Sequence, residues 1–257
     1  MSSIVQSLVS SGHHIQLLFD PVWSKATSDH VVRQFIDRTD NVVMDWSVQR
    51  TDKWRRWIFF SRELRSYISY TKRSNQSSYY LKRWNRYLPW AIGLFVYLRP
   101  VKFLLSRSPV YQWLAAVETH VPPDQKIAAD ILHRKPDVLV VTPMNQRFSE
   151  EVEYVKAAKT VNIPTVVPVL TWDNLTTKGI FHVIPDLTLV WNKEQRNEAI
   201  DIHNVPEEKV LITGSPFFDK WFDAGELLED RRAFCQRMGF DPAKPFFVYL
   251  GSSAKIA

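Results

Sequence analysis

Three apolar segments in the second half of the chain each end in polar, turn-forming residues, and this repeated pattern most limits the possible folds. The segments 164–170, 187–191 and 209–213 have the length and composition of buried strands and are separated by polar or helical stretches. Alternating strands and helices are typical of α/β proteins with parallel sheets, in which ligands bind at the carboxyl ends of the strands. We therefore predict an α/β fold with a Rossmann-like parallel sheet and a ligand-binding cleft at these strand ends.

The remaining sequence predicts further elements of both kinds. Helices are expected at 4–11, 123–133, 149–161, 193–203, 217–222 and 226–238, and strands at 13–19, 137–141 and 244–250. The apolar strand at 137–141 is expected to be buried on both faces, as in the middle of a parallel sheet. Ser149 is expected to cap the helix that follows it, with three glutamates in the first turn of that helix. Gly12 and Gly239 are expected to end helices.

Both ends of the sequence suggest that it belongs to a larger fold. A helix before the first strand is unusual for a doubly wound sheet, so we infer that another strand lies upstream. At the other end, the strand at 244–250 leads into a turn of small residues, as at the start of a new βα unit. We expect one Rossmann-like domain over residues 1–240 and the beginning of a second over residues 241–257.

Basic residues are concentrated in one part of the chain. Residues 50–107 contain fourteen Lys or Arg and two acidic residues, a net charge of +12, whereas the whole chain carries +6. We expect a helical insert at about 50–120 that packs on the sheet, with 88–98 buried and its charges in solvent. Contact of 50–107 with anionic membrane headgroups is a second interpretation, because tryptophan and arginine alternate there. Nucleic-acid binding is a third, which we do not expect.

Several classes of protein lack support in this sequence. The single cysteine, Cys235, excludes an internal disulfide framework and suits a reducing cytoplasm, and we expect its thiol to be half-buried and inert. There is no signal-peptide pattern and no apolar run long enough to span a bilayer. No Gly-x-Gly or Asp-x-Asp pair occurs, and the histidines are not spaced as metal ligands. We therefore expect a cytoplasmic protein with neither a cofactor nor a metal site.

Candidate site residues crowd the loop that follows the 164–170 strand. The carboxylate of Asp173 could act as a general base for an acceptor hydroxyl, and Lys178 could hold a phosphate. In the alternative interpretation, Asp173 and Asn174 form a local turn and Trp172 covers the core. Thr176 completes this polar group.

Two further turns contain small residues. Gly214 would let backbone N–H groups approach an anion, although Ser215 could equally be the N-cap of an ordinary strand-to-helix turn. Gly251, Ser252 and Ser253 form a similar turn, and we predict that it could hold a phosphate.

These motifs resemble a known family. The loop Trp172-Asp173-Asn174-Leu175-Thr176-Thr177-Lys178-Gly179 and the turn Thr213-Gly214-Ser215-Pro216-Phe217-Phe218-Asp219 are similar to segments of bacterial GT-B glycosyltransferases and their teichoic-acid glycerophosphotransferase relatives. The glycerophosphotransferases carry Trp-His-Gly-Thr and Gly-x-Pro-Arg-x-Asp at these places. Here Asp173 replaces the histidine and Phe217 replaces the arginine, which favours sugar transfer over glycerophosphate transfer.

The resemblance implies an activity. Residues 1–240 would be the acceptor-side domain and 241–257 the start of a truncated donor-binding domain, so the chain by itself is expected to be inactive. The complete enzyme would transfer a glycosyl group from a nucleotide-sugar, without a metal, to a polysaccharide or lipid-linked acceptor in cell-envelope synthesis. It would work in the cytoplasm, at the inner face of the plasma membrane.

The resemblance also suggests roles for the candidate residues. Asp173 would be the base or would orient the acceptor. The acceptor pocket would be shaped by Trp172, Asn174 and Thr176, and the donor diphosphate would lie near Gly214, Ser215, Gly251 and Ser252. Two alternatives stay open, namely a non-hydrolysing sugar-nucleotide epimerase of related fold and a non-enzymatic membrane or nucleic-acid adaptor that uses the basic insert.

Overall fold

The structure is a computed structural model that describes residues 2–21, 34, 36–73, 77–86, 88, 108–222 and 229–249. The chain divides into two compact units, unit 1 (Met1–Ser215) and unit 2 (Pro216–Ala257). Most of the apolar segment expected to be buried at 88–98 lies outside the described residues, as do Gly251, Ser252 and Ser253.

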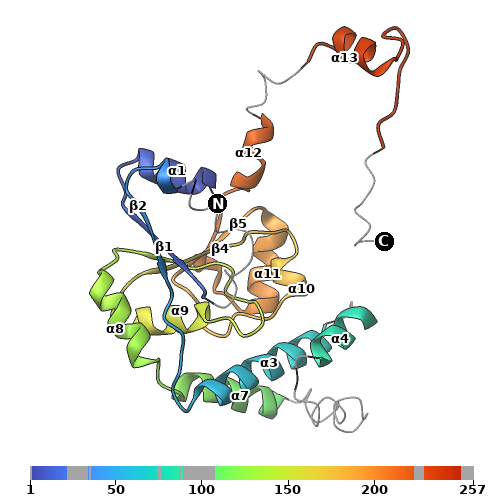
Figure 1. Ribbon diagram of the computed structural model, residues 1–257. Helices are drawn as coiled ribbons and strands as arrows, with labels where there is room; N and C mark the ends of the chain where they lie inside the picture. The colour runs from blue at the N-terminus through green and yellow to red at the C-terminus, as the bar shows by residue number, and fades with distance from the viewer. Residues whose placement is uncertain are drawn as a thin grey trace. The chain divides into compact units, whose positions relative to one another are not determined.

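Unit 1 is an α/β structure with parallel strands, which confirms the predicted class (Figure 1). Its strands are β1 (Ile15–Phe19), β2 (Val42–Trp46), β3 (Leu139–Val140), β4 (Thr165–Pro168), β5 (Leu187–Val190) and β6 (Val210–Ile212). Its helices are α1 (Ser2–Ser10), α3 (Arg55–Thr71), α4 (Ser78–Asn85), α7 (Ser108–His120), α8 (Gln125–Arg134), α9 (Glu151–Thr160), α10 (Asn174–Thr177) and α11 (Lys193–His203), with a 3-10 turn, η1 (Glu207–Lys209).

The strands form two parallel sheets. β1 pairs with β2, and β3, β4, β5 and β6 pair in chain order. Each parallel connection must cross back over the sheet, and α9, α10 and α11 lie in the three crossovers of the larger sheet. Buried apolar side chains join that sheet to its helices, including Val155 of α9, Val167 of β4, Val190 of β5 and Ala199 of α11. This core fixes the positions of the loops at the strand ends.

The prediction that β3 is buried on both faces is wrong. β3 is the edge strand of its sheet, paired only with β4 among the described residues. Val138 and Val140 are 47% and 56% exposed. A run of apolar residues cannot by itself distinguish a central strand from an edge strand that is covered on one side.

The prediction that Ser149 caps α9 is also wrong. Glu150 occupies the N-cap position without a side-chain bond, and the Ser149 hydroxyl donates to Glu151 Oε2 at 2.6 Å. By contrast, the Asp124 carboxylate caps α8 by accepting from Lys126 N at 2.8 Å, and Asn192 caps α11 through Gln195 N at 2.9 Å. Glu150 and Glu153 at the start of α9 instead form ion pairs with arginines of the basic segment.

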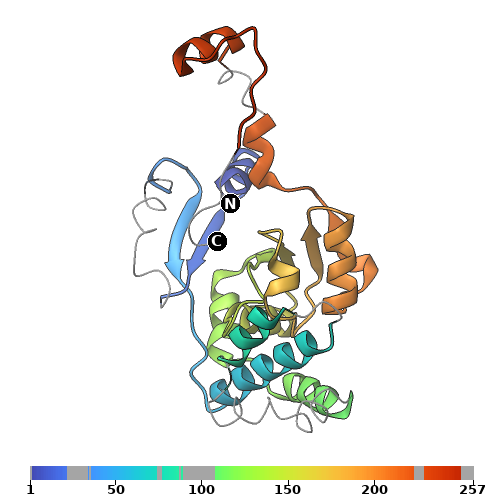
Figure 2. The ribbon, with the colours of Figure 1, turned by 90° about the vertical axis from the view of Figure 1, so that its right-hand side faces the viewer.

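Helices α3, α4 and α7 pack together as a separate layer (Figure 2). Their shared apolar cluster includes Leu64, Tyr67 and Ile68 of α3 and Leu114 of α7, and Leu88 is buried against it. The expected helices of the basic segment are thus seen in α3, α4 and α7, but this apolar cluster joins them to one another and includes no residue of the described strands. None of the helices in the described parts of the chain combines the length and the apolar character needed to cross a bilayer.

Unit 2 contains α12 (Pro216–Phe222) and α13 (Arg231–Met238), and Gly239, at a φ of 72°, ends α13 as expected. Phe234, Phe240 and Phe246 pack ring against ring, and Cys235 is fully buried rather than half-buried. The predicted strand at 244–250 is wrong for its described part, because residues 245–249 pair with no strand. The prediction of a second domain at 241–257 stays a prediction.

Candidate functional site

Helix α3 contacts the loops that leave the carboxyl ends of β3 and β4. Its Glu63 accepts a hydrogen bond from the backbone N–H of Phe148 at 2.9 Å, in the loop after β3. Beyond the end of the helix, Arg73 donates to the carbonyl of Thr176, in the short helix α10 that follows β4. The basic segment is therefore part of the edge of the sheet at which ligands are expected.

A pocket of about 1080 Å³ lies between the first half of α3 and the loop after β3. Seven of its lining residues are charged and five are apolar. The residues are Asp52, Lys53, Arg55, Arg56, Trp57, Phe59, Phe60, Glu63, Arg86, Leu88, Arg147 and Phe148. Five cations face two carboxylates, so the pocket suits an anion, and four aromatic rings provide apolar surface beside the charges.

The carboxyl group of Glu63 has an unusual environment within this pocket. The residue is 4% exposed, and its Oε2 has no hydrogen-bond partner in the described part of the chain. Burial raises the pKa of Glu63 to about 7, although the Phe148 N–H and the charges of Arg147 and Arg62 oppose the rise. A carboxyl group with this pKa can gain or lose a proton near neutral pH, which is what general acid–base chemistry requires.

The pocket cations are not equivalent. Arg55 is paired with Glu150 and lies over the Phe59 ring at 5.0 Å, and Arg147 lies over the Phe148 ring at 4.3 Å. Arg56 and Arg86 form no ion pair with any residue that the structure describes. Their charges are therefore available to a ligand.

Buried ion pairs hold α3 in place beneath the pocket. Arg62 donates to both oxygens of Glu118 on α7, at 2.7 and 2.8 Å, and is 2.6 Å from Glu153 on α9. Glu153 also pairs with Arg50 at 2.7 Å, and Lys156 with Glu118 at 3.1 Å. Burial opposes the charge on Glu118, but Arg62 and Lys156 outweigh it and hold its pKa at about 2. The expectation that charges of the insert lie in solvent is thus wrong for Arg50 and Arg62, which are 0% and 3% exposed.

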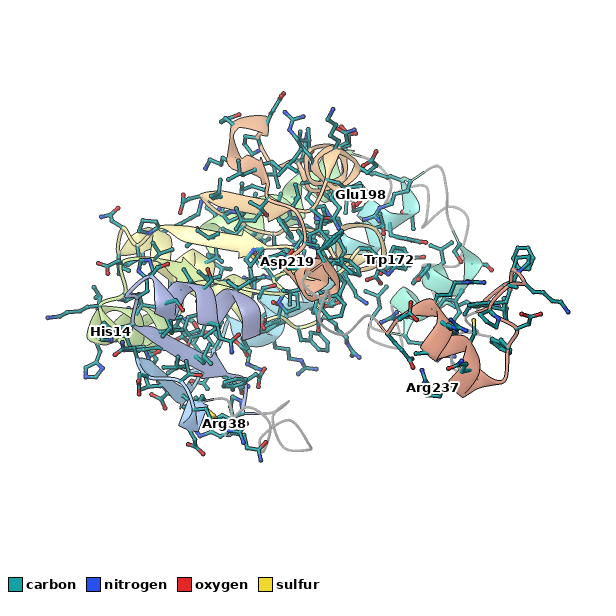
Figure 3. All side chains as sticks on the ribbon, turned by 90° about the horizontal axis from the view of Figure 1, so that it is seen from above. His14, Arg38, Trp172, Glu198, Asp219 and Arg237 are labelled. Atoms are coloured by element: carbon teal, nitrogen blue, oxygen red, sulfur yellow. The ribbon has the colours of Figure 1, made fainter. Side chains whose placement is uncertain are left out.

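The loop after β4 presents its predicted residues differently. Trp172 is 74% exposed, so it does not cover the core, and Figure 3 shows it on the same side of unit 1 as Glu198 of α11. Asn174 is 6% exposed, and its carbonyl accepts from Asn145 Nδ2 at 2.6 Å. The loop therefore presents the exposed ring of Trp172 next to the buried, hydrogen-bonded Asn174.

Asp173 is already engaged by its neighbours. Its carboxylate accepts from the hydroxyls of Thr171 and Thr177, both at 2.8 Å, and lies 3.6 Å from Lys178 Nζ. Although partial burial opposes the charge, these partners lower the pKa of Asp173. The lowered pKa makes Asp173 a weaker base, so its carboxylate suits the positioning of a ligand better than proton abstraction. Lys178 is ion-paired with Asp173, which makes it less suited to binding a phosphate.

The ends of β4, β5 and β6 form a continuous row. Trp191 Nε1 donates to the carbonyl of Val169 at 2.7 Å, and the backbone N–H of Thr213 donates to the carbonyl of Val190 at 2.9 Å. Gly214 follows with a φ of 80°, a conformation that favours glycine, and the Ser215 hydroxyl is buried without a partner in the described chain. The Trp172 loop and the Gly214 turn thus belong to one edge of the sheet.

The pocket residues Glu63, Arg147 and Phe148 were not among the sequence-based candidates. One signal could have indicated Glu63, because it is one of only two acids within the strongly basic segment. In the ranges that the structure describes, no cluster of His, Cys, Asp or Glu has the composition of a metal site.

No protein-family model matches the sequence, and no curated protein shows significant similarity to it.

Proposed function

We propose that unit 1 is the acceptor-side domain of a metal-independent glycosyltransferase with a Rossmann-like fold of the GT-B type. The complete enzyme would transfer a glycosyl group from a nucleotide-sugar to a polysaccharide or lipid-linked acceptor. The observation that carries this proposal is the row formed by the ends of β4, β5 and β6, where an exposed Trp172 adjoins an ordered carboxylate. Ligands of open parallel sheets bind at this edge.

The geometry suggests roles within this proposal. The Trp172 ring would pack against the apolar face of an acceptor sugar, and Asp173 would accept a hydrogen bond from its hydroxyl. Thr171 and Thr177 already hold that carboxylate in place, so binding would need little reorganisation. The N–H groups near Gly214 would approach the donor diphosphate.

We place the enzyme at the inner face of the plasma membrane. In support of this, three aromatic side chains on the α3–α4–α7 layer, Trp57, Tyr79 and Trp113, are each 65–66% exposed. Exposed aromatic residues among basic ones are typical of peripheral contact with anionic headgroups.

A transfer assay tests the proposal. The chain, and in parallel the product of its complete reading frame, is incubated with radiolabelled nucleotide-sugars and cell-envelope membranes, and label in lipid and polymer fractions is measured. We expect Asp173→Asn and Trp172→Ala to reduce transfer by about tenfold or more, and Trp46→Ala, at another exposed tryptophan, to leave it unchanged. Release of an epimerised sugar without an acceptor would instead establish the epimerase alternative, and the absence of both products would contradict the proposal.

A further inference from the structure

We infer that the pocket between α3 and the loop after β3 is a binding site for an organic phosphate, with Glu63 as its proton-exchanging group. The site goes beyond the proposed function, because Trp172, Asp173 and Gly214 are not among its lining residues. It would exist whether or not the chain takes part in glycosyl transfer.

The charges of the pocket indicate a phosphate. Arg56 and Arg86 reach the lining from two separate segments, and neither forms an ion pair in the described chain. Guanidinium groups bind phosphate oxygens through paired, charge-assisted hydrogen bonds. Arg147 adds a third positive charge from the loop after β3. The pocket is thus cationic on more than one side.

The size and apolar lining indicate that the phosphate carries an organic group. A volume of about 1080 Å³ is far larger than a phosphate ion and lies at the upper end of the range for small-molecule pockets. The rings of Phe59 and Phe148 meet edge to face, with centroids 6.1 Å apart, and Phe60 and Trp57 extend this surface. A ring or a hydrocarbon chain attached to the phosphate would cover these rings.

Glu63 supplies the remaining group. It is 4% exposed and lines the pocket, and only its Oε1 is occupied, by the N–H of Phe148. Its Oε2 is buried without a partner in the described part of the chain, so Glu63 acts on a bound phosphate through its charge: the carboxyl group is neutral when protonated and repels the phosphate when ionised. The charged groups that surround Glu63 are Arg62 on its own helix, Arg147 in the loop after β3, and, around the pocket, Asp52, Lys53, Arg55, Arg56 and Arg86.

Binding measurements by calorimetry test the phosphate site. Phenyl phosphate is compared with inorganic phosphate and with phenol. We expect it to bind about tenfold more tightly than either, because only phenyl phosphate contacts both the charged and the apolar residues of the lining. Uridine monophosphate, and vesicles of phosphatidylcholine with and without phosphatidic acid, then distinguish a nucleotide source of the phosphate from a lipid source.

Two double variants locate the site. Arg56→Gln with Arg86→Gln should weaken phenyl phosphate binding by about tenfold or more. The matched control, Arg38→Gln with Arg232→Gln, removes two exposed arginines outside the pocket and should leave binding unchanged. Unchanged binding by the pocket variant, or equal weakening by the control, would overturn the inference.

The role of Glu63 is tested with diphenyl phosphate, whose single charge stays constant over the pH range used. Between about pH 6 and pH 8 the wild-type affinity should fall by about tenfold, because Glu63 ionises. Glu63→Gln keeps an oxygen for the Phe148 N–H and should bind with the same affinity at both pH values. If the affinities of the wild type and of Glu63→Gln change with pH in the same way, Glu63 is not the proton-exchanging group of the site. Phosphate binding without glycosyl transfer would leave this inference intact and contradict only the proposed function.

Discussion

The backbone N–H of Phe148 donates to Oε1 of Glu63 across 85 residues of sequence. This bond connects the basic helix α3 to the loop after β3, and the second carboxylate oxygen of Glu63 is buried without a partner in the described part of the chain. The same contact therefore joins α3 to this loop at a buried titratable group in the lining of the pocket.

Glu63 should make stability depend on pH. Its pKa rises from 4.5 to about 7 on folding, so the folded state holds the proton more tightly, and stability falls as the pH rises through that interval. Glu63→Gln cannot ionise, and it should gain stability relative to the wild type by about 2 kcal/mol between pH 5 and pH 8. Urea unfolding at both pH values measures this gain. Glu208→Gln, at an exposed carboxylate, should show no such trend.

Arg62 should be essential for stability. Arg62→Met would leave Glu118 and Glu153 buried without their shared cation, at a cost of about 3 to 5 kcal/mol. Arg196→Met, which breaks the more exposed pair with Glu207, should cost less than about 1 kcal/mol. Denaturant unfolding compares the two variants. Similar losses would show that the buried network does not hold α3.

Trp172 should contribute to binding and not to folding. Its side chain is 74% exposed, so Trp172→Ala should change the free energy of unfolding by less than about 0.5 kcal/mol. Leu175→Ala, in the same loop but fully buried, should cost about 2 to 5 kcal/mol. Thermal unfolding of the two variants separates a functional surface residue from its structural neighbour. A large loss for Trp172→Ala would mean that the ring packs against the protein.

Two substitutions in the turn after β6 should have different effects on stability, because one changes the backbone conformation and the other removes a buried hydroxyl. At Gly214 an added Cβ would meet nothing within 4 Å, but the φ of 80° is unfavourable for alanine, so Gly214→Ala should cost about 1 to 2 kcal/mol. Ser215→Ala removes a buried hydroxyl without a partner in the described chain and should be neutral or slightly stabilising. Chemical denaturation provides both values. A destabilising Ser215→Ala would reveal a hydrogen bond to that hydroxyl.

The local parts of the fold could be predicted because they depend on short-range chemistry. The helix α11 and the positive φ at Gly239 follow from patterns within a few residues. The position of β3 at a sheet edge, by contrast, depends on which strands pair, and that information is not local. Ser149 was misassigned as a cap for a related reason, since Glu150 and Glu153 are held by distant arginines.

The candidate site was only partly predictable. Trp172 and Asp173 could be found because they follow a recognisable strand, but the partners that lower the pKa of Asp173 depend on how the loop closes. The pocket brings Glu63 of α3 together with Phe148, which is 85 residues away in the sequence. Such a site forms only through tertiary packing, and neither spacing nor composition indicates it.

Arg50 and Arg62 are each paired with buried carboxylates, so the net positive charge of this protein overstates the charge at its surface. Because both guanidinium groups are consumed by internal carboxylates, they contribute little to the field that an approaching polyanion encounters. A deletion of residues 50–107 would remove these buried ion pairs together with the exposed cations. Single substitutions, compared by their retention on heparin or on an anionic resin, separate the two contributions. Arg56 and Lys53, which are exposed, would then account for more of the elution shift than Arg62.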